Sequence, residues 1–195
     1  MYSIDWDVPE PRKGLLGAID RLVGPGATDA EYGLQAGVPV LAAFSAVCYA
    51  LTLPLDWGIL QYVLVGVLAF DISGGVVTNA TSTAKRWFHR PGQSRSDKMA
   101  FITLHTFHLL LVCWLFGQWD LEWFSISLGL LLGTSLVILW APLYLQRPLA
   151  FTAYGLVLAI TGSLLHSIPG LEWFLPLFFL KLLLSHLLLE APFRP

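Results

Sequence analysis

The chain has 195 residues, of which 56% are hydrophobic and 12% carry a formal charge, and its net charge is −2. An ordinary soluble domain is roughly 45–50% apolar and about 25% charged, so this composition argues strongly against a soluble globule. The mean hydropathy of +0.68 points the same way. Disordered, collagen-like and disulfide-stapled chains are excluded, and the length suits about six membrane-spanning helices of ~20 residues.

Residues 1–33 form a polar segment that we expect to lie in the cytoplasm. Within it, apolar residues recur at helical spacing and predict a short amphipathic helix in the membrane interface. These residues are Leu15, Leu16, Ile19, Leu22 and Val23. We interpret the helix as an anchor, and the alternative is a lid over a cytoplasmic opening.

Six apolar segments follow, and they predict an all-α, polytopic membrane domain over residues 34–190, built as a six-helix bundle. They run approximately over residues 34–53, 58–80, 99–116, 123–145, 149–166 and 171–190. The stretch 81–98 is a basic cytoplasmic loop, and residues 191–195 form a C-terminal tail. Turn residues, Pro148 among them, separate the segments.

The basic residues predict the orientation, because cytoplasmic segments retain Lys and Arg. With six spans, ten of the eleven basic residues fall on one side: Arg12, Lys13, Arg21, Lys85, Arg86, Arg90, Arg95, Lys98, Arg147 and Arg194. The loops on the other side carry only acidic charges: Asp56, Asp120, Glu122 and Glu172. We therefore predict that both termini are cytoplasmic and that the protein is integral to a membrane of the bacterial inner type.

Polar residues inside the spans indicate where any chemistry should lie. The second predicted helix carries Asp71 and Asn79 on one face, the third carries His105 and His108, and the sixth carries three more. Those three are Lys181, His186 and Glu190. The pair His186 and Glu190 is spaced i, i+4, so an α-helix would place both side chains on one face.

The level of these residues in the membrane adds a spatial expectation. At a rise of 1.5 Å per residue, Asp71, His108 and Lys181 lie roughly 13–14 Å from the cytoplasmic edge, and His105 and His186 lie about 6–9 Å from it. Ionisable groups inside a membrane face one another or a wet cavity. We therefore predict that the second, third and sixth helices adjoin around a polar pocket open to the cytoplasm.

The leading hypothesis is an enzyme acting on a lipid-soluble substrate by metal-dependent or proton-transfer chemistry. The candidate catalytic residues are Asp71, Asn79, His105, His108, Lys181, His186 and Glu190. A zinc or iron ion would draw its ligands from His105, His108, His186 and Asp71. Proton transfer would use a histidine beside Asp71, because imidazole titrates near neutral pH. Lys181 at the level of Asp71 counts against a cation there.

Two alternatives remain open at this point. In the first, Asp71 and Lys181 form a structural ion pair and the histidines bond to the neighbouring backbone. In the second, the chain is a small proton-coupled carrier or a non-catalytic subunit of a membrane complex. Such a subunit would hold haem or a pigment between His186 and either His105 or His108.

Other motifs predict contacts with lipids and with a second copy. Lys85, Arg86, His89 and Arg90 would meet anionic lipid headgroups, although the positive-inside rule alone also explains this cluster. Ser125, Gly129 and Gly133 form a small-residue row that permits close helix packing, internally or in a homodimer. His166 at the outer end of the fifth predicted helix is interpreted as an interfacial histidine. Nothing indicates a nucleic-acid partner.

Overall fold

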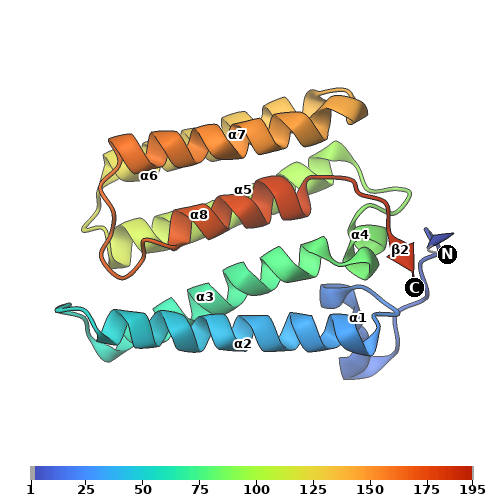
Figure 1. The fold of residues 1–195 in the computed structure, drawn as a ribbon, viewed down its shortest axis with the longest axis horizontal. Coiled ribbons are helices and arrows are strands. Elements are labelled where there is room, and N and C mark those ends of the chain that lie inside the picture. Colours follow the sequence, from blue (N-terminus) through green and yellow to red (C-terminus); the bar gives the residue numbers. More distant parts are fainter. Residues whose placement is uncertain (1–2, 195) are drawn as a thin grey trace.

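The computed structural model describes residues 3–194 and is all-helical apart from one short strand pair. Five helices are long and apolar enough to cross a membrane. They are α2 (Asp29–Leu51), α3 (Ile59–Ala80), α5 (Arg95–Leu115), α6 (Leu121–Trp140) and α7 (Leu143–Leu164). All run along the long axis of the molecule (Figure 1), so the bundle has two ends where its loops gather.

The last apolar segment is shorter than the predicted span 171–190. It forms α8 (Phe174–Phe179), which continues directly into a π-helix, η1 (Leu180–His186). At 1.5 Å per residue this helix is about 20 Å long, whereas a bilayer core is ~30 Å thick. It lies in the middle of the bundle between the α2–α3 and α6–α7 layers (Figure 1), where nearly all of its side chains are buried. Because protein surrounds the helix, side chains can satisfy its terminal carbonyl groups.

The helices pack in sequence-adjacent pairs around this central segment. Helix α2 packs against α3, α5 against α6 and α6 against α7, while η1 contacts both α3 and α7. The fully buried side chains of Phe174, Phe178, Phe179 and Leu182 lie in this centre. The hydrophobic core is therefore built around this segment, which is largely buried along its length.

Both ends of the described chain lie at the same end of the bundle (Figure 1). Strand β1 (Ser3–Ile4) pairs antiparallel with β2 (Phe193–Arg194). The short helices α1 (Gly14–Val23) and α4 (Ser82–Phe88) lie at this end as well. Six passes along the long axis, counting α8 and η1 as the sixth, bring the chain back to the end where it began.

Two helix boundaries differ from the sequence-based expectation for physical reasons. Helix α2 begins at Asp29 because Thr28 and Glu31 form a reciprocal capping box. The fourth and fifth passes are separated at Ala141 and Pro142, and Pro148 lies inside α7. Proline is tolerated within membrane helices because neighbouring groups can satisfy the freed carbonyl, so Pro148 is not a break.

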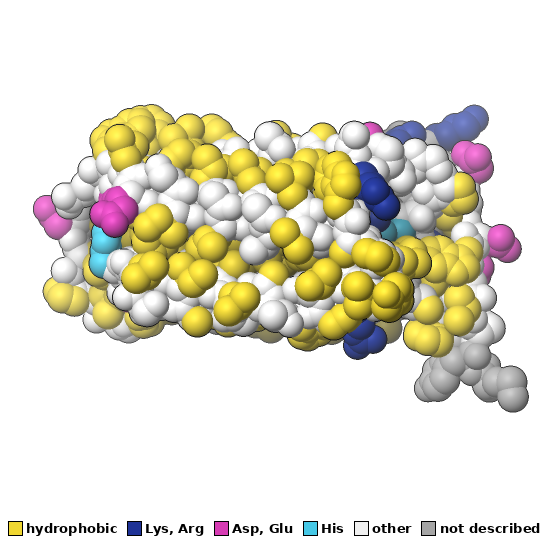
Figure 2. Space-filling model, turned by 90° about the horizontal axis from the view of Figure 1, so that it is seen from above, with side chains coloured by type: hydrophobic (Ala, Val, Ile, Leu, Met, Phe, Trp, Pro, Cys, Tyr) yellow, Lys and Arg dark blue, Asp and Glu magenta, His cyan; other side chains and the backbone are white. Residues whose placement is uncertain are grey.

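The surface is apolar along the length of the bundle and charged at its ends. On the face shown in Figure 2, hydrophobic side chains cover the middle, while Lys and Arg lie only toward one end. Large exposed apolar side chains occur on every one of the five long helices, for example Phe44, Ile59, Leu104, Val137 and Tyr144. This pattern suits a protein whose sides contact lipid.

Candidate functional site

Three ionisable residues from three helices meet inside the bundle. The Lys181 Nζ atom of η1 lies 2.6 Å from Asp71 Oδ2 of α3. The His108 Nε2 atom of α5 lies 3.1 Å from the same carboxylate oxygen. The structure thus brings together the three residues placed at one level by the helical rise, and we call them the Asp71 triad.

A glycine on α3 makes room for this contact. Gly75 lies one turn after Asp71, and a β-carbon at this position would overlap the Lys181 side chain at Cδ and Cε. The lysine stem therefore lies directly against the backbone of α3, and its ammonium group reaches back to Asp71. The absence of a side chain at Gly75 is what permits the ion pair.

The triad is open on its carboxylate side. The Lys181 side chain is 3% exposed, whereas 45% of the Asp71 side chain and 22% of the His108 side chain are exposed. A charge inside a membrane span is costly unless it is paired, and the lysine satisfies that requirement. The exposed part of the carboxylate is left available to a molecule that arrives from outside the bundle.

His108 and Asp71 form an oriented dyad. When Nε2 donates its proton to the carboxylate, the lone pair of the ring lies on Nδ1. The Nδ1 atom of His108 is buried and has no hydrogen-bond partner among residues 3–194. A carboxylate that fixes the tautomer of a histidine in this way leaves the other nitrogen as a base.

A column of aromatic rings extends from this dyad toward the end of the bundle that carries the termini. The ring of His105 stacks on that of His108 with centroids 5.1 Å apart, and His105 Nδ1 hydrogen-bonds to the Phe101 carbonyl at 2.8 Å. The Phe101 ring lies 4.2 Å from His105 and 3.9 Å from His186. The inner part of the predicted polar pocket is therefore filled by stacked rings, and Phe101 separates His186 from the other two histidines.

The π-helix decides which residues of the last segment share a face. Hydrogen bonds from residue i to i+5, such as Leu187 N to Leu182 O at 3.2 Å, widen the winding of η1. Residues five apart then lie close to one another, which brings Lys181 and His186 to the same side. The prediction that His186 and Glu190 share one face assumes an α-helix, whereas η1 ends at His186 and Glu190 lies beyond it.

The remaining predicted polar residues lie outside the triad. Asn79 donates from Nδ2 to the Gly75 carbonyl of its own helix at 2.9 Å. Glu190 is 42% exposed, and its Oε2 atom lies 3.8 Å from Lys85 Nζ. Neither side chain contacts Asp71 or His108, so nothing in the geometry adds them to the dyad.

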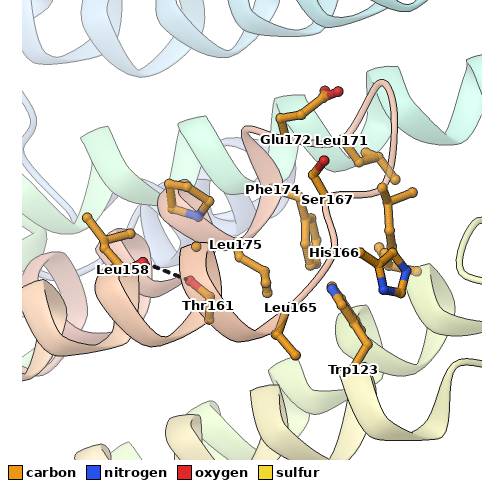
Figure 3. A pocket seen from close by; sticks show the side chains of 14 residues that line it. Trp123, Leu158, Thr161, Leu165, His166, Ser167, Leu171, Glu172, Phe174 and Leu175 are labelled. Carbon is orange, nitrogen blue, oxygen red and sulfur yellow. Dashed lines mark hydrogen bonds between the residues drawn. The ribbon is translucent and has the colours of Figure 1, made fainter.

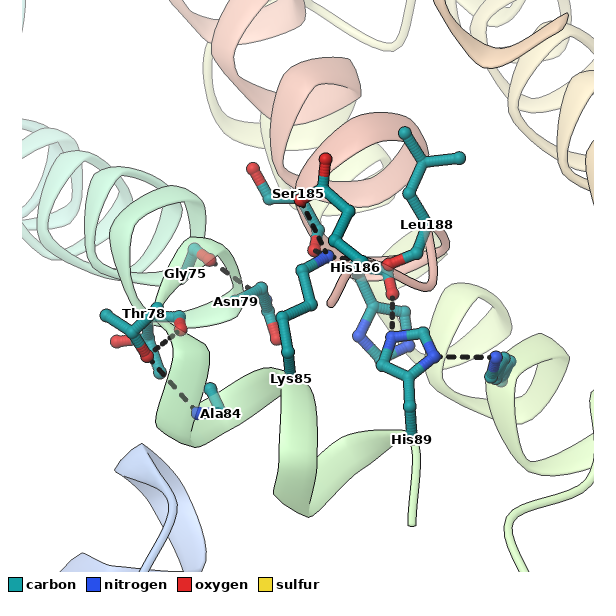
Figure 4. A network of polar contacts seen from close by, with 12 residues as sticks. Gly75, Thr78, Asn79, Ala84, Lys85, His89, Ser185, His186 and Leu188 are labelled. Carbon is teal, nitrogen blue, oxygen red and sulfur yellow. Dashed lines mark hydrogen bonds and ion pairs between the residues drawn. The ribbon is translucent and has the colours of Figure 1, made fainter. Parts of the chain in front are cut away.

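Side chains of the basic loop form hydrogen bonds inside the protein, although the sequence predicts that they meet lipid headgroups (Figure 4). Lys85 donates from Nζ to the carbonyl oxygens of Ser185 at 2.6 Å and Leu188 at 2.7 Å. His89 Nε2 donates to the His186 carbonyl at 3.0 Å, and its Nδ1 atom accepts from Lys98 Nζ at 2.9 Å. Lys85 and His89 thus satisfy backbone carbonyl groups at the end of the last helix, where no further helical turn supplies N–H donors.

Burial lowers the pKa values of Lys85 and His89, the two side chains that bond to the end of the last helix. Burial lowers the pKa of Lys85 to about 8, against the opposing influence of Glu190. It also lowers the pKa of His89 to about 3, assisted by the positive charges of Lys98 and Lys85. His89 is therefore neutral at physiological pH, as its contact with Lys98 requires.

Arg86 and Arg90, the other two predicted headgroup ligands, differ in how deeply they are buried. Lys85 and Arg86 are both only 2% exposed, so the expectation that these two cations are presented to lipid is not met. The guanidinium of Arg86 bonds to the Asp5 carboxylate at 3.0 Å and the Asp7 carbonyl at 2.7 Å. Arg90 is stacked 3.8 Å over the Trp87 ring and stays nearer the surface.

The predicted metal and haem sites do not fit this arrangement. Within the described chain, no group of three or more His, Cys, Asp or Glu side chains is placed to hold a metal ion. The Asp71 carboxylate is engaged by the Lys181 ammonium group, which would repel a cation. A haem between His105 and His186 would need the space that Phe101 fills. We therefore derive no step through either group.

The small-residue row on α6 is not used for packing inside the described part of the bundle. A β-carbon at Gly129 or Gly133 would have no neighbour within 4 Å. Both glycines line an apolar groove between α6 and α7 of about 370 Å³. The row therefore does not serve packing within this part of the bundle. Its contact with a second copy of the chain stays a prediction.

No protein-family model, curated protein or solved structure matches this chain.

Proposed function

We propose that the chain is a six-pass protein of the bacterial inner membrane with both termini in the cytoplasm. Both ends of the described chain lie at one end of the bundle, near Lys85, Arg86 and Lys98. The loops at the opposite end carry acidic residues and no Lys or Arg. Helix α1 supports an interfacial position, because Leu15 and Leu22 on its outer face are 80% and 70% exposed.

Cysteine labelling tests this topology. Gln93 and Asp56 lie in loops at opposite ends of the bundle, so single cysteines at these positions in a Cys48→Ser background should face opposite sides of the membrane. A membrane-impermeant maleimide added to intact spheroplasts is expected to label Asp56→Cys, and Gln93→Cys only after lysis. Labelling of both from outside would overturn the six-pass arrangement.

We infer that the protein is an enzyme that transfers a proton in a lipid-soluble substrate. The observation that carries this proposal is the Asp71–His108 dyad, set within membrane-spanning helices and with an unpartnered buried nitrogen. The Lys181 ammonium pairs with one oxygen of Asp71, and 45% of the Asp71 side chain is still exposed, which leaves part of it available to a substrate.

Each member of the triad has a distinct role in this proposal. His108 Nδ1 is enclosed in the ligand-free chain, so in this proposal substrate binding displaces the side chains that cover it. The nitrogen then accepts a proton from a hydroxyl or an activated carbon of the substrate, and the ring becomes an imidazolium. Asp71 orients the ring and stabilises the imidazolium, while the Lys181 ammonium keeps Asp71 ionised. The same proton is returned to the substrate or its product at the end of the reaction, so His108 starts the next cycle neutral.

Lipid analysis of cells that express single variants tests the proposal. His108→Gln removes the base but keeps a hydrogen-bonding side chain. We expect cells with the wild-type chain to differ in extracted lipids from cells without it, and cells with the variant to match the cells without it. Phe107→Leu, at an exposed neighbouring position, is the matched control and should behave as wild type. If a wild-type lipid change persists in a well-expressed His108→Gln variant, or if the wild-type chain changes no lipid, the proposed activity is wrong.

A further inference from the structure

A cavity at the acidic end of the bundle has the features of a second binding site (Figure 3). It has a volume of about 250 Å³ and lies between α5, α6, α7 and the loop before α8. A second cavity of about 430 Å³ adjoins it, and both are bordered by His166 and Ile168. The imidazole that the sequence indicated to be merely interfacial thus lies at the junction of two cavities.

The first cavity is lined by a hydrogen-bond donor. Trp123 is only 3% exposed, and no hydrogen bond joins its indole nitrogen to another described residue. This nitrogen is not among the fully enclosed, unpartnered polar atoms of the described chain, so it borders the open space of the cavity. In Figure 3 the ring of Trp123 projects into the cavity with its nitrogen end foremost. An indole N–H can only donate, so it calls for an acceptor atom in the cavity.

The second polar group of the cavity is His166, which lies beside Asp120. Asp120 Oδ1 accepts from the backbone N–H of Trp123 at 2.9 Å and caps α6. Its Oδ2 atom lies 3.4 Å from His166 Nδ1. A carboxylate beside Nδ1 favours the tautomer with the proton on that nitrogen, which leaves Nε2 as an acceptor. The cavity wall therefore carries Trp123 as a donor and His166 as an acceptor, beside the hydroxyl groups of Thr161 and Ser167 and the carboxylate of Glu172.

Trp123 and His166 select the chemistry of the occupant. A hydroxyl group can accept from Trp123 and donate to His166 with a single oxygen atom. Phe174 and Leu175 supply apolar walls for the body of the molecule. An anion is disfavoured, because Glu172 and Asp120 border the cavities and no Lys or Arg lines either of them.

We propose that this cavity binds the hydroxyl group of an uncharged alcohol or phenol with an apolar body. The occupant is either a hydroxylated lipid that enters from the bilayer or a small amphipathic solute that enters from the acidic end. The cavity lies on the acidic side of the Asp71 triad, with its lining residue Val112 one helical turn from His108, and neither Asp71, His108 nor Lys181 lines it. Its binding of an alcohol does not depend on the proposed proton transfer.

Calorimetric titration of the full chain in maltoside detergent with 4-butylphenol tests the site, with a detergent blank to remove micelle partitioning. One molecule is expected to bind per chain. The methyl ether 4-butylanisole cannot donate to His166 and should bind about tenfold more weakly, the effect of one hydrogen bond of ~1.4 kcal/mol. Equal binding of phenol and ether, or no binding of either, would overturn the proposal without any variant.

A matched pair of tryptophan variants locates the binding. Trp123→Phe keeps an aromatic ring but removes the N–H, and it is expected to weaken phenol binding about tenfold. Trp140→Phe, at the far end of the same helix, should bind phenol as wild type does. Loss of binding in both variants, or in neither, would contradict the assigned site. In nanodiscs, displacement of the phenol by diacylglycerol assigns a lipid ligand, and retention of the phenol assigns a small solute.

Discussion

Replacing Asp71 with Leu is expected to destabilise the folded protein by about 3–5 kcal/mol, because it strands the Lys181 ammonium group inside the bundle. Lys181 is 3% exposed, and without the carboxylate its one remaining contact in the described chain is the carbonyl of residue 71 at 3.4 Å. The measurement is thermal unfolding in mild detergent, followed by circular dichroism, together with the yield of monodisperse protein.

The double variant Asp71→Leu/Lys181→Met is the decisive control. Removing both charges and keeping their volume is often neutral for a buried pair, so most of the lost stability should return. The double variant should nevertheless be inactive if the proposed function holds, because His108 then lacks the carboxylate that orients it. If the single and double variants are equally unstable, the ion pair is not what Asp71 contributes.

The same contact can be disturbed without removing a charge. Gly75→Ala places a β-carbon where the Lys181 stem lies, so it should destabilise the protein by about 1–3 kcal/mol. Gly129→Ala is the matched control, since a β-carbon there meets nothing within 4 Å. Equal melting temperatures for the two variants would show that the lysine stem does not pack on α3 as described.

The second large effect is a loss of stability in acid that depends on His89. Burial holds the pKa of this histidine at about 3, against an ordinary value of 6.5. Below pH 6.5 the unfolded chain takes up a proton at His89 that the folded chain excludes, so stability falls as pH drops from 6.5 to 3. The loss at this one residue reaches at most about 5 kcal/mol, the value approached below pH 3. Above pH 6.5 the residue makes no pH-dependent contribution.

His89→Gln isolates this effect from other acid titrations. The glutamine amide can still donate to the His186 carbonyl, so stability at neutral pH should stay within about 1 kcal/mol of wild type. Melting temperatures measured from pH 7.5 to pH 4 should fall less steeply for the variant than for wild type. Parallel curves would mean that another group controls the acid transition. Lys85, whose pKa is about 8, changes charge only at alkaline pH and does not interfere.

Much of the architecture follows from local properties of the sequence. Runs of apolar residues predict long helices with exposed apolar sides, and five such helices are present. The rise per residue is fixed in an α-helix, so counting from the helix ends places Asp71 and His108 at one level. Those two residues lie within hydrogen-bonding distance in the structure. A one-dimensional argument succeeds here because level along the axis is a one-dimensional property.

The placement of side chains around the helix axis could not be predicted in this way. A winding of 3.6 residues per turn would place His186 and Glu190 on one face, whereas the π-winding of η1 turns His186 toward the side of Lys181. Lys85 was expected at the surface because it belongs to a basic loop. It is buried because the short last helix needs donors for its terminal carbonyl groups.

The sequence by itself therefore determined that this is a helical membrane-type protein, which of its helices are apolar, and at what level its few intramembrane charges lie. Only the tertiary structure decided that Lys181 pairs with Asp71, that Phe101 separates the histidines, and that His166 borders a cavity. The physical reason is that hydropathy and helical rise are set by neighbouring residues. Partner choice instead depends on which helix faces meet, and those faces are brought together from distant parts of the chain.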